Sequence, residues 1–211
     1  MPSTDDASRL LHVVGLFYDS ILDEDKWLPA LQELANYTGG HAAGYVVADP
    51  SRGAVVQCET VSIDPVFTQK YLSYYAQREV RLEPALPFQV GEVMTEGMLL
   101  ERRELERSEI YGDLLLPYEI PNFMFSWLLK SPTSVKTIAV QGTRRHGPFA
   151  ADSIQKLEQV LPHLARVVQL RDSLQTARRA VSSMLEAFEG LPFAVALVDE
   201  SGRVLDKTSR A

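Results

Sequence analysis

The stretch NFMFSWLLKSPTSVKTIAVQG, residues 122–142, decides the predicted fold. Runs rich in aromatic and β-branched residues lie on either side of Ser131 and Pro132, and this pattern predicts two strands joined by a short turn. A second pair of valine-rich runs, AAGYVVAD (42–49) and GAVVQCETVS (53–62), surrounds another polar turn. Strands that neighbour each other at hairpin distance indicate an antiparallel sheet.

Helical patterns surround these hairpins. Apolar residues recur at helical spacing over residues 8–20 and 27–38, and Asp64 with Pro65 begins a third helical run. The charged run LERRELERSEIYGDLLL (100–116) predicts a fourth helix. The resulting order, α-α-β-β-α-α-β-β-α, predicts an α+β fold in which an antiparallel sheet carries flanking helices. We assign residues 1–150 to this domain.

A long amphipathic helix is predicted over residues 151–190. Its first half carries apolar residues in a register that suits packing on its own domain. A second register then continues for three heptads, and an exposed apolar stripe of this kind favours a parallel homodimer through a coiled coil. The alternative is a helix that folds back on its own domain. The candidate dimer residues are Val167, Leu170, Leu174, Ala177, Val181, Met184 and Phe188.

The segment LPFAVALVDESGRVLDKTSRA, residues 191–211, reads as the start of another domain. An apolar run, a polar turn ending in Gly202 and a return strand predict a hairpin. An isolated hairpin is marginally stable, so we expect this sheet to be completed by residues outside the chain.

Composition excludes several classes of protein. No apolar run approaches the ~20 residues that a membrane-spanning helix needs. The single cysteine, Cys58, excludes an intramolecular disulfide and fits a reducing cytoplasm. A net charge of −7 argues against nucleic-acid binding by these residues themselves.

No catalytic or metal-binding motif is present in the sequence. The four histidines lack ligand spacing with other His, Cys or carboxylate residues, so we expect neither a metal nor a cofactor. We therefore expect a protein that is not an enzyme. A small enzyme would need a catalytic pair such as Tyr75 with Glu79.

An aromatic set falls on the predicted sheet and on the helix that covers it. Such residues line a ligand cavity or fill a core, and composition alone favours the filled core. The set consists of Tyr45, Tyr71, Tyr75, Phe123, Phe125 and Trp127.

Four stretches of the chain resemble a known family: DKWLPALQELANYTGG (25–40), YLSYYAQREVRLEPAL (71–86), GEVMTEGMLLERRELERSEIYGDLLLPYEI (91–120) and GPFAADSIQKLEQVLPHLARVVQLRDSL (147–174). Together they resemble the N-terminal half of bacterial LuxR-type transcriptional regulators with a GAF- or PAS-like sensory region. The resemblance implies a GAF/PAS-like fold followed by a signalling helix. It also implies a helix-turn-helix DNA-binding domain, which is absent from this chain, and a truncated PAS-like domain over residues 191–211.

Quorum-sensing members of that family carry an aromatic-x-x-x-Tyr pair followed by Asp-Pro, which positions an acyl-homoserine lactone. Phe67 and Tyr71 have this spacing, and Glu79 with Val80 stands at the acidic step without the proline. Without the proline we do not expect lactone recognition at Phe67, Tyr71 and Glu79. A different or unidentified ligand, or a purely structural role, fits these residues better.

The leading hypothesis is the sensory and dimerisation region of a cytoplasmic LuxR-family regulator. A signal would be relayed through a coiled-coil helix to DNA-binding domains outside this chain. The alternative is a stand-alone module that binds a small molecule or another protein without any output at DNA.

Overall fold

The computed structural model describes residues 4–188 and 195–207. The chain divides into two compact units, residues 1–167 and 168–211, and the boundary falls inside the last long helix. The first unit is built around a five-stranded antiparallel sheet with strand order β2-β1-β5-β4-β3. The strands are β1 (Ala42–Asp49), β2 (Ala54–Val61), β3 (Val93–Thr95), β4 (Asn122–Lys130) and β5 (Val135–Gly142).

Both predicted hairpins are confirmed, and the pairing of β1 with β5 joins them into one sheet. The edge strand β3 follows an irregular segment and was not predicted. Its three residues are too few to show the alternation by which strands are recognised in a sequence.

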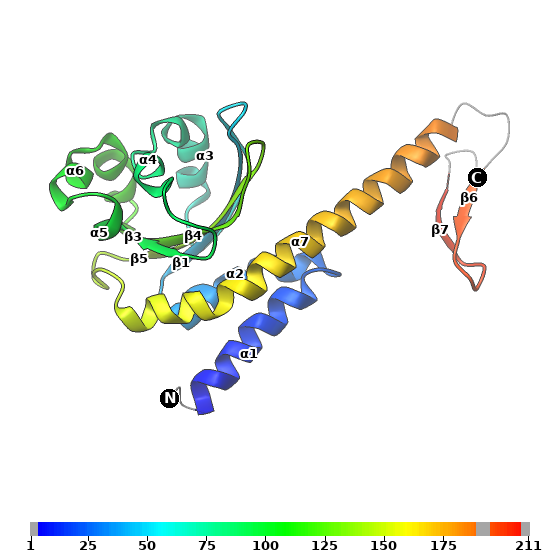
Figure 1. Cartoon of the computed structure of the whole chain (residues 1–211), viewed down its shortest axis with the longest axis horizontal. Coiled ribbons are helices and arrows are strands. Elements are labelled where there is room, and N and C mark those ends of the chain that lie inside the picture. The colour runs from blue at the N-terminus through cyan, green and yellow to red at the C-terminus, as the bar shows by residue number, and fades with distance from the viewer. Residues whose placement is uncertain (1–3, 189–194, 208–211) are drawn as a thin grey trace. The chain divides into compact units, whose positions relative to one another are not determined.

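One face of the sheet is covered by α1 (Thr4–Asp19), α2 (Trp27–Thr38) and the first half of α7 (Ala151–Phe188) (Figure 1). A short 3-10 turn, η1 (Glu24–Lys26), connects α1 with α2. Gly39 ends α2 with φ of 76°, in the left-handed region that favours glycine. The Trp27 ring lies between Phe17 and Tyr45, at centroid distances of 5.4 and 5.2 Å. We call this face the core face.

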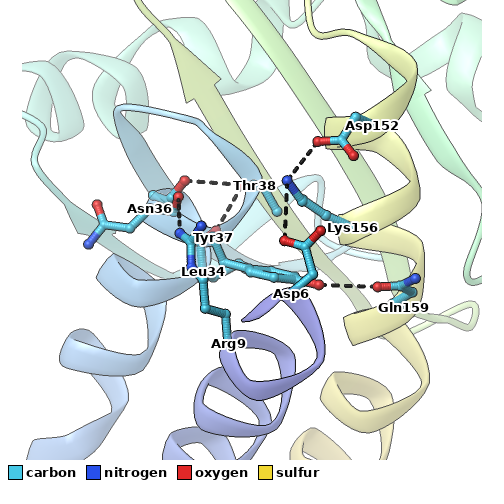
Figure 2. A network of polar contacts seen from close by, with 10 residues as sticks. Asp6, Arg9, Leu34, Asn36, Tyr37, Thr38, Asp152, Lys156 and Gln159 are labelled. Carbon is cyan, nitrogen blue, oxygen red and sulfur yellow. Dashed lines mark hydrogen bonds and ion pairs between the residues drawn. The ribbon is translucent and has the colours of Figure 1, made fainter. Parts of the chain in front are cut away.

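A polar network ties α1 and α2 to the beginning of α7 (Figure 2). Lys156 on α7 lies 3.9 Å from the Asp6 carboxylate on α1. Tyr37 on α2 donates a hydrogen bond to Gln159 on α7, at 3.1 Å between Oη and Oε1. Arg9 lies over the Tyr37 ring, 5.8 Å from its centroid. The Lys156–Asp6 pair is partly exposed and long, so it stabilises little by itself. The network therefore orients three helices that apolar packing holds together.

The opposite face carries short helices: α3 (Pro65–Ser73), η2 (Tyr75–Arg78), α4 (Leu82–Ala85), α5 (Glu96–Leu99), α6 (Arg102–Arg107) and the π-helical turn η3 (Tyr111–Leu115) (Figure 1). Asp64 caps α3 by accepting a hydrogen bond from the Val66 amide at 2.8 Å. The single helix predicted over residues 100–116 is wrong. Ser108 adopts an extended backbone and separates α6 from η3, while Tyr111 and Leu114 turn into the core.

Helix α7 (Ala151–Phe188) matches the predicted long helix. Its leucine and valine residues from Leu157 to Val168 are buried, and Leu157, Val160 and Leu164 are completely inaccessible. From residue 173 onward the side chains that the structure describes are half-buried or exposed. None of the helices in the described part of the chain is long and apolar enough to cross a membrane.

The second unit contains the rest of α7 and a two-stranded hairpin, β6 (Ala196–Val198) and β7 (Val204–Lys207). The Asp199 carboxylate accepts hydrogen bonds from the backbone amides of Ser201 and Arg203, at 2.9 and 3.0 Å. Gly202 supplies a positive φ of 82°. The predicted terminal hairpin is thus present, although its first residues, 193 and 194, lie outside the described residues.

Candidate functional site

The two faces of the central strands differ in how completely they are covered. Along β5, residues 135, 137, 139 and 141 are half-buried, whereas Lys136, Ile138 and Val140 between them are buried. Successive side chains of a strand point to opposite faces. The half-buried set therefore faces α3, α4 and α5, and we call this side the site face.

Small residues occupy the middle of the site face. Gly44 on β1 is the cross-strand partner of Ala139 on β5. A Cβ atom added to Gly44 would lie 3.4 Å from the Thr60 methyl group and 3.9 Å from Gln141 Nε2. Gly44 is buried and Ala139 is half-buried. We call this stretch of small residues, which lies between larger neighbours on both sides, the floor of the site face.

Aromatic residues of β4 form one side of this floor. Phe123, Phe125 and Trp127 lie on the site face with successive ring centroids 5.8 and 5.6 Å apart. The Trp127 indole donates a hydrogen bond to the carbonyl oxygen of Ala85 at 3.2 Å, which holds α4 against the strand. Ala139 packs against the same cluster.

Helix α3 forms the other side. Phe67 and Tyr71, one helical turn apart, stack with their ring centroids 6.5 Å apart. The hydroxyl groups of Thr68 on α3 and Thr60 on β2 are hydrogen-bonded at 3.1 Å. Tyr75 packs on the edge of the Phe67 cluster.

A buried ion pair lies among these aromatic residues. Glu79 accepts two hydrogen bonds from the Arg81 guanidinium, and their side chains are 4 % and 15 % exposed. The guanidinium carbon lies 4.4 Å from the centroid of the Phe123 ring. Burial lowers the pKa of Arg81, but the Glu79 carboxylate more than offsets that effect, so the pKa of Arg81 lies above its usual value.

Two neighbouring groups are held in their neutral forms. Burial, followed by the charge of Glu79, raises the pKa of the Tyr71 phenol above its usual value. Burial and the charge of Glu59 raise the pKa of the Cys58 thiol to about 11. At neutral pH the site therefore offers a phenol and a thiol as neutral polar groups.

Glu96 brings another carboxylate to this region from the first position of α5. Its Oε2 accepts a hydrogen bond from the Phe123 amide at 3.2 Å. Its Oε1 is buried and has no hydrogen-bond partner in the part of the chain that the structure describes. The same is true of Oε1 of Gln141, the cross-strand partner of Phe123.

Most of the predicted ligand residues lie on the site face, where the structure places them in two clusters. Phe67, Tyr71 and Tyr75 belong to one cluster, and Phe123, Phe125 and Trp127 to a second cluster on the same face of the sheet. Glu79 lies with them and is paired with Arg81.

Tyr45 does not lie with this set. It is only 6 % exposed and packs against Trp27 on the core face. Its cross-strand partner is the buried Ile138, so strand alternation places it opposite the half-buried set.

Sequence reasoning missed Arg81, Glu96 and Gln141. Arg81 and Glu96 lie on short irregular segments without a periodic pattern. Gln141 was treated only as part of a strand. The charged residues inside the otherwise apolar region 79–99 are the one sequence signal that could have indicated buried pairing.

The predicted dimer residues differ in accessibility. Val167 is completely buried within the chain, so its side chain belongs to the core. Leu170, Leu174 and Val181 are half-buried, and Ala177 is exposed. Met184 is 62 % exposed. The side chain of Phe188 lies outside the described residues.

No protein-family model matches the chain, and no curated protein matches it in sequence. Solved structures do match its fold. The LBD domain of VqsR from Pseudomonas aeruginosa aligns with a TM-score of 0.60 at 11 % identity, over 77 % of this chain and 95 % of that one. The N-acylhomoserine lactone dependent LuxR family transcription factor CepR2 from Burkholderia cenocepacia aligns with a TM-score of 0.56 at 11 % identity, over 80 % and 98 %.

A GAF domain from a phosphoenolpyruvate-protein phosphotransferase of Coxiella burnetii also aligns, with a TM-score of 0.49 at 13 % identity over 81 % of this chain and 98 % of that one. The predicted GAF/PAS-like fold class is confirmed by the alignments with the VqsR and CepR2 structures: the chain has an α+β fold with an antiparallel sheet, flanking helices and a long C-terminal helix.

Proposed function

We propose that this chain is the sensory and dimerisation region of a cytoplasmic LuxR-type transcriptional regulator. A small molecule binds on the site face, and its binding is relayed through the second half of α7 to DNA-binding domains outside this chain. The observation that carries the proposal is the half-covered site face, whose small residues lie between aromatic side chains and buried charged groups. A site of this composition suits a small ligand with an apolar part and a polar group.

The fold supports the same proposal. CepR2, which shares this fold, is described as an N-acylhomoserine lactone dependent transcription factor. A ligand that binds one conformation of the domain better than another would shift the equilibrium between them. The proposal includes no catalytic step, because Glu79, which an enzyme hypothesis would pair with Tyr75, is bound to Arg81.

The ligand part of the proposal is tested by thermal unfolding of the purified chain with a panel of small amphipathic molecules. The panel contains hexylamine, hexanamide, hexanoate and N-hexanoyl-homoserine lactone. We expect at least one member to raise Tm in a saturable manner, because a ligand that binds only the native state stabilises it. A panel without any stabilising member, together with a loss of stability from Ala139→Leu as large as overpacking a filled core causes, would mean that this face is an ordinary core without a ligand.

The relay part is tested by the solution mass measured with light scattering. Residues 174 and 181 are two heptad positions of the apolar stripe on α7. We expect a dimer that becomes a folded monomer when both carry glutamate, since buried charges at such positions oppose pairing. The matched control is Gln175→Glu with Ser182→Glu, which adds the same charges one position further at exposed sites. A wild-type chain that is already monomeric would contradict dimerisation through this stripe.

A further inference from the structure

We propose that the site face takes a positively charged ligand, a small molecule that carries a protonated amine, and that the Glu96 carboxylate binds its ammonium group. This inference rests on the proposed function and names the ligand class of the same site. It follows from an unused buried carboxylate oxygen, from the balance of charges around it and from the rings beside it.

The first observation is the Glu96 side chain itself, which is 8 % exposed. One oxygen accepts the Phe123 amide at 3.2 Å, and the other is buried without a partner among the described residues. A buried carboxylate oxygen without a hydrogen-bond donor is costly, because it has lost water and gained nothing. A ligand that supplies a donor would remove this cost.

The second observation is the charge around Glu96. Two guanidinium groups, Arg81 and Arg102, lie close enough for Glu96 to raise their pKa. Each is already paired with another carboxylate: Arg81 with Glu79, and Arg102 with Glu106 at 2.6 Å. Neither guanidinium group is paired with Glu96, so within the described part of the chain the Glu96 carboxylate has no counterion of its own. A cationic ligand completes the balance.

The third observation is a second buried acceptor atom near Phe123 that has no hydrogen-bond donor. Gln141 Oε1 is buried without a partner, and Gln141 is the direct cross-strand neighbour of Phe123 on the site face. Both unpartnered buried atoms that the structure describes on this face are thus acceptors. An ammonium group has three donors and no acceptor, so it matches them.

The aromatic side of the floor favours the same chemistry. The faces of aromatic rings attract cations. Phe123, whose amide is hydrogen-bonded to Glu96, already carries the Arg81 guanidinium over its ring, and Phe125 and Trp127 follow it on the same face of β4. The half-buried Ala139 packs beside the same rings, and its short side chain is where the apolar part of the ligand would lie. A carboxylate ligand would meet the charge of Glu96 instead, and a neutral amide would satisfy a hydrogen bond without compensating the charge.

Calorimetric titration of the whole chain with hexylamine, hexanamide and hexanoate tests the inference, because these probes share one chain length and differ only in the polar group. We expect hexylamine to bind about 10-fold more tightly than hexanamide, as hydrogen bonds to charged groups are stronger than those between neutral groups. We expect no binding of hexanoate. Glu96→Gln should weaken hexylamine about 10-fold and leave hexanamide within about 3-fold.

The matched control is Glu83→Gln, which removes an exposed carboxylate from α4 and should leave all three affinities unchanged. Circular dichroism checks that Glu96→Gln is folded. Should it not fold, Glu96→Asp keeps the charge one methylene farther back and should retain the preference for hexylamine over hexanamide.

Two results separate failure of this inference from failure of the proposed function. If hexanamide or N-hexanoyl-homoserine lactone binds as tightly as hexylamine and Glu96→Gln changes nothing, the cationic ligand class is wrong while small-molecule binding stands. If no probe binds and none raises Tm, both proposals fail.

Discussion

The two faces of the same five-stranded sheet are built in different ways. On the core face, residues such as Ala43, Ile138 and Val140 are completely buried beneath three helices. On the site face, their immediate strand neighbours Gly44 and Ala139 are small, and charged groups lie buried beside aromatic rings. The core face carries the stability expected of close packing. The half-buried residues of β5 show that the site face gives up part of that packing, as we expect of the binding site proposed there.

The largest expected difference between the faces comes from truncation on β5. Ile138→Ala should cost about 3–4 kcal/mol of unfolding free energy, because it opens a cavity in a fully buried region. Thr137→Ala, one residue earlier on the half-buried face, should cost less than about 1 kcal/mol. Urea denaturation measures both values. Equal costs would contradict the difference in packing.

The buried ion pair gives the next largest effect. Arg81→Leu should cost about 3 kcal/mol, because it leaves the Glu79 carboxylate buried without its partner. The double variant Arg81→Leu with Glu79→Leu should recover much of that loss, since it leaves no uncompensated charge. A double variant no more stable than the single one would show that the two residues act independently.

Substituting a small residue by a larger one should also have different effects on stability at the two faces. Ala43→Leu should cost about 2 kcal/mol, because its site on the core face has no free space. Ala139→Leu on the half-buried site face should cost less than about 1 kcal/mol while weakening ligand binding. If both substitutions cost the same, the floor of the site face is already filled.

The smallest effect concerns Cys58, the only cysteine. Its pKa, raised from the usual 9.0 to about 11, should slow alkylation by iodoacetamide at pH 8 about 100-fold relative to the unfolded chain, because the thiolate is the reactive form. The same shift means that its contribution to stability is full below pH 9 and is lost as pH rises toward 11. Alkylation as fast as in urea would contradict a thiol shielded on the site face.

The sequence predicts most elements of this fold but only part of the site. The alternation in residues 122–142 fixes which side chains share a face of one strand, so Phe123, Phe125 and Trp127 were placed together. Alternation does not say which face of β1 matches them, so Tyr45 was grouped with residues that lie on the opposite face of the sheet. That relation depends on the register between β1 and β5, a long-range pairing.

The polar half of the site could not be predicted for a related reason. Arg81 directly precedes α4, and Glu96 is the first residue of α5. Both helices are too short to carry a periodic pattern. The charged run over residues 100–116 was also misread as one helix, because helical propensity does not reveal that Tyr111 and Leu114 must turn inward.

The chain contains two tryptophans, and they report on the two faces separately. Trp127 lies on the site face and Trp27 on the core face. In a fluorescence titration with hexylamine, the Trp27→Phe protein, which keeps Trp127, should show a saturable change in emission, and the Trp127→Phe protein should show none. A response confined to Trp27, or one shared equally by both, would contradict ligand binding on the site face.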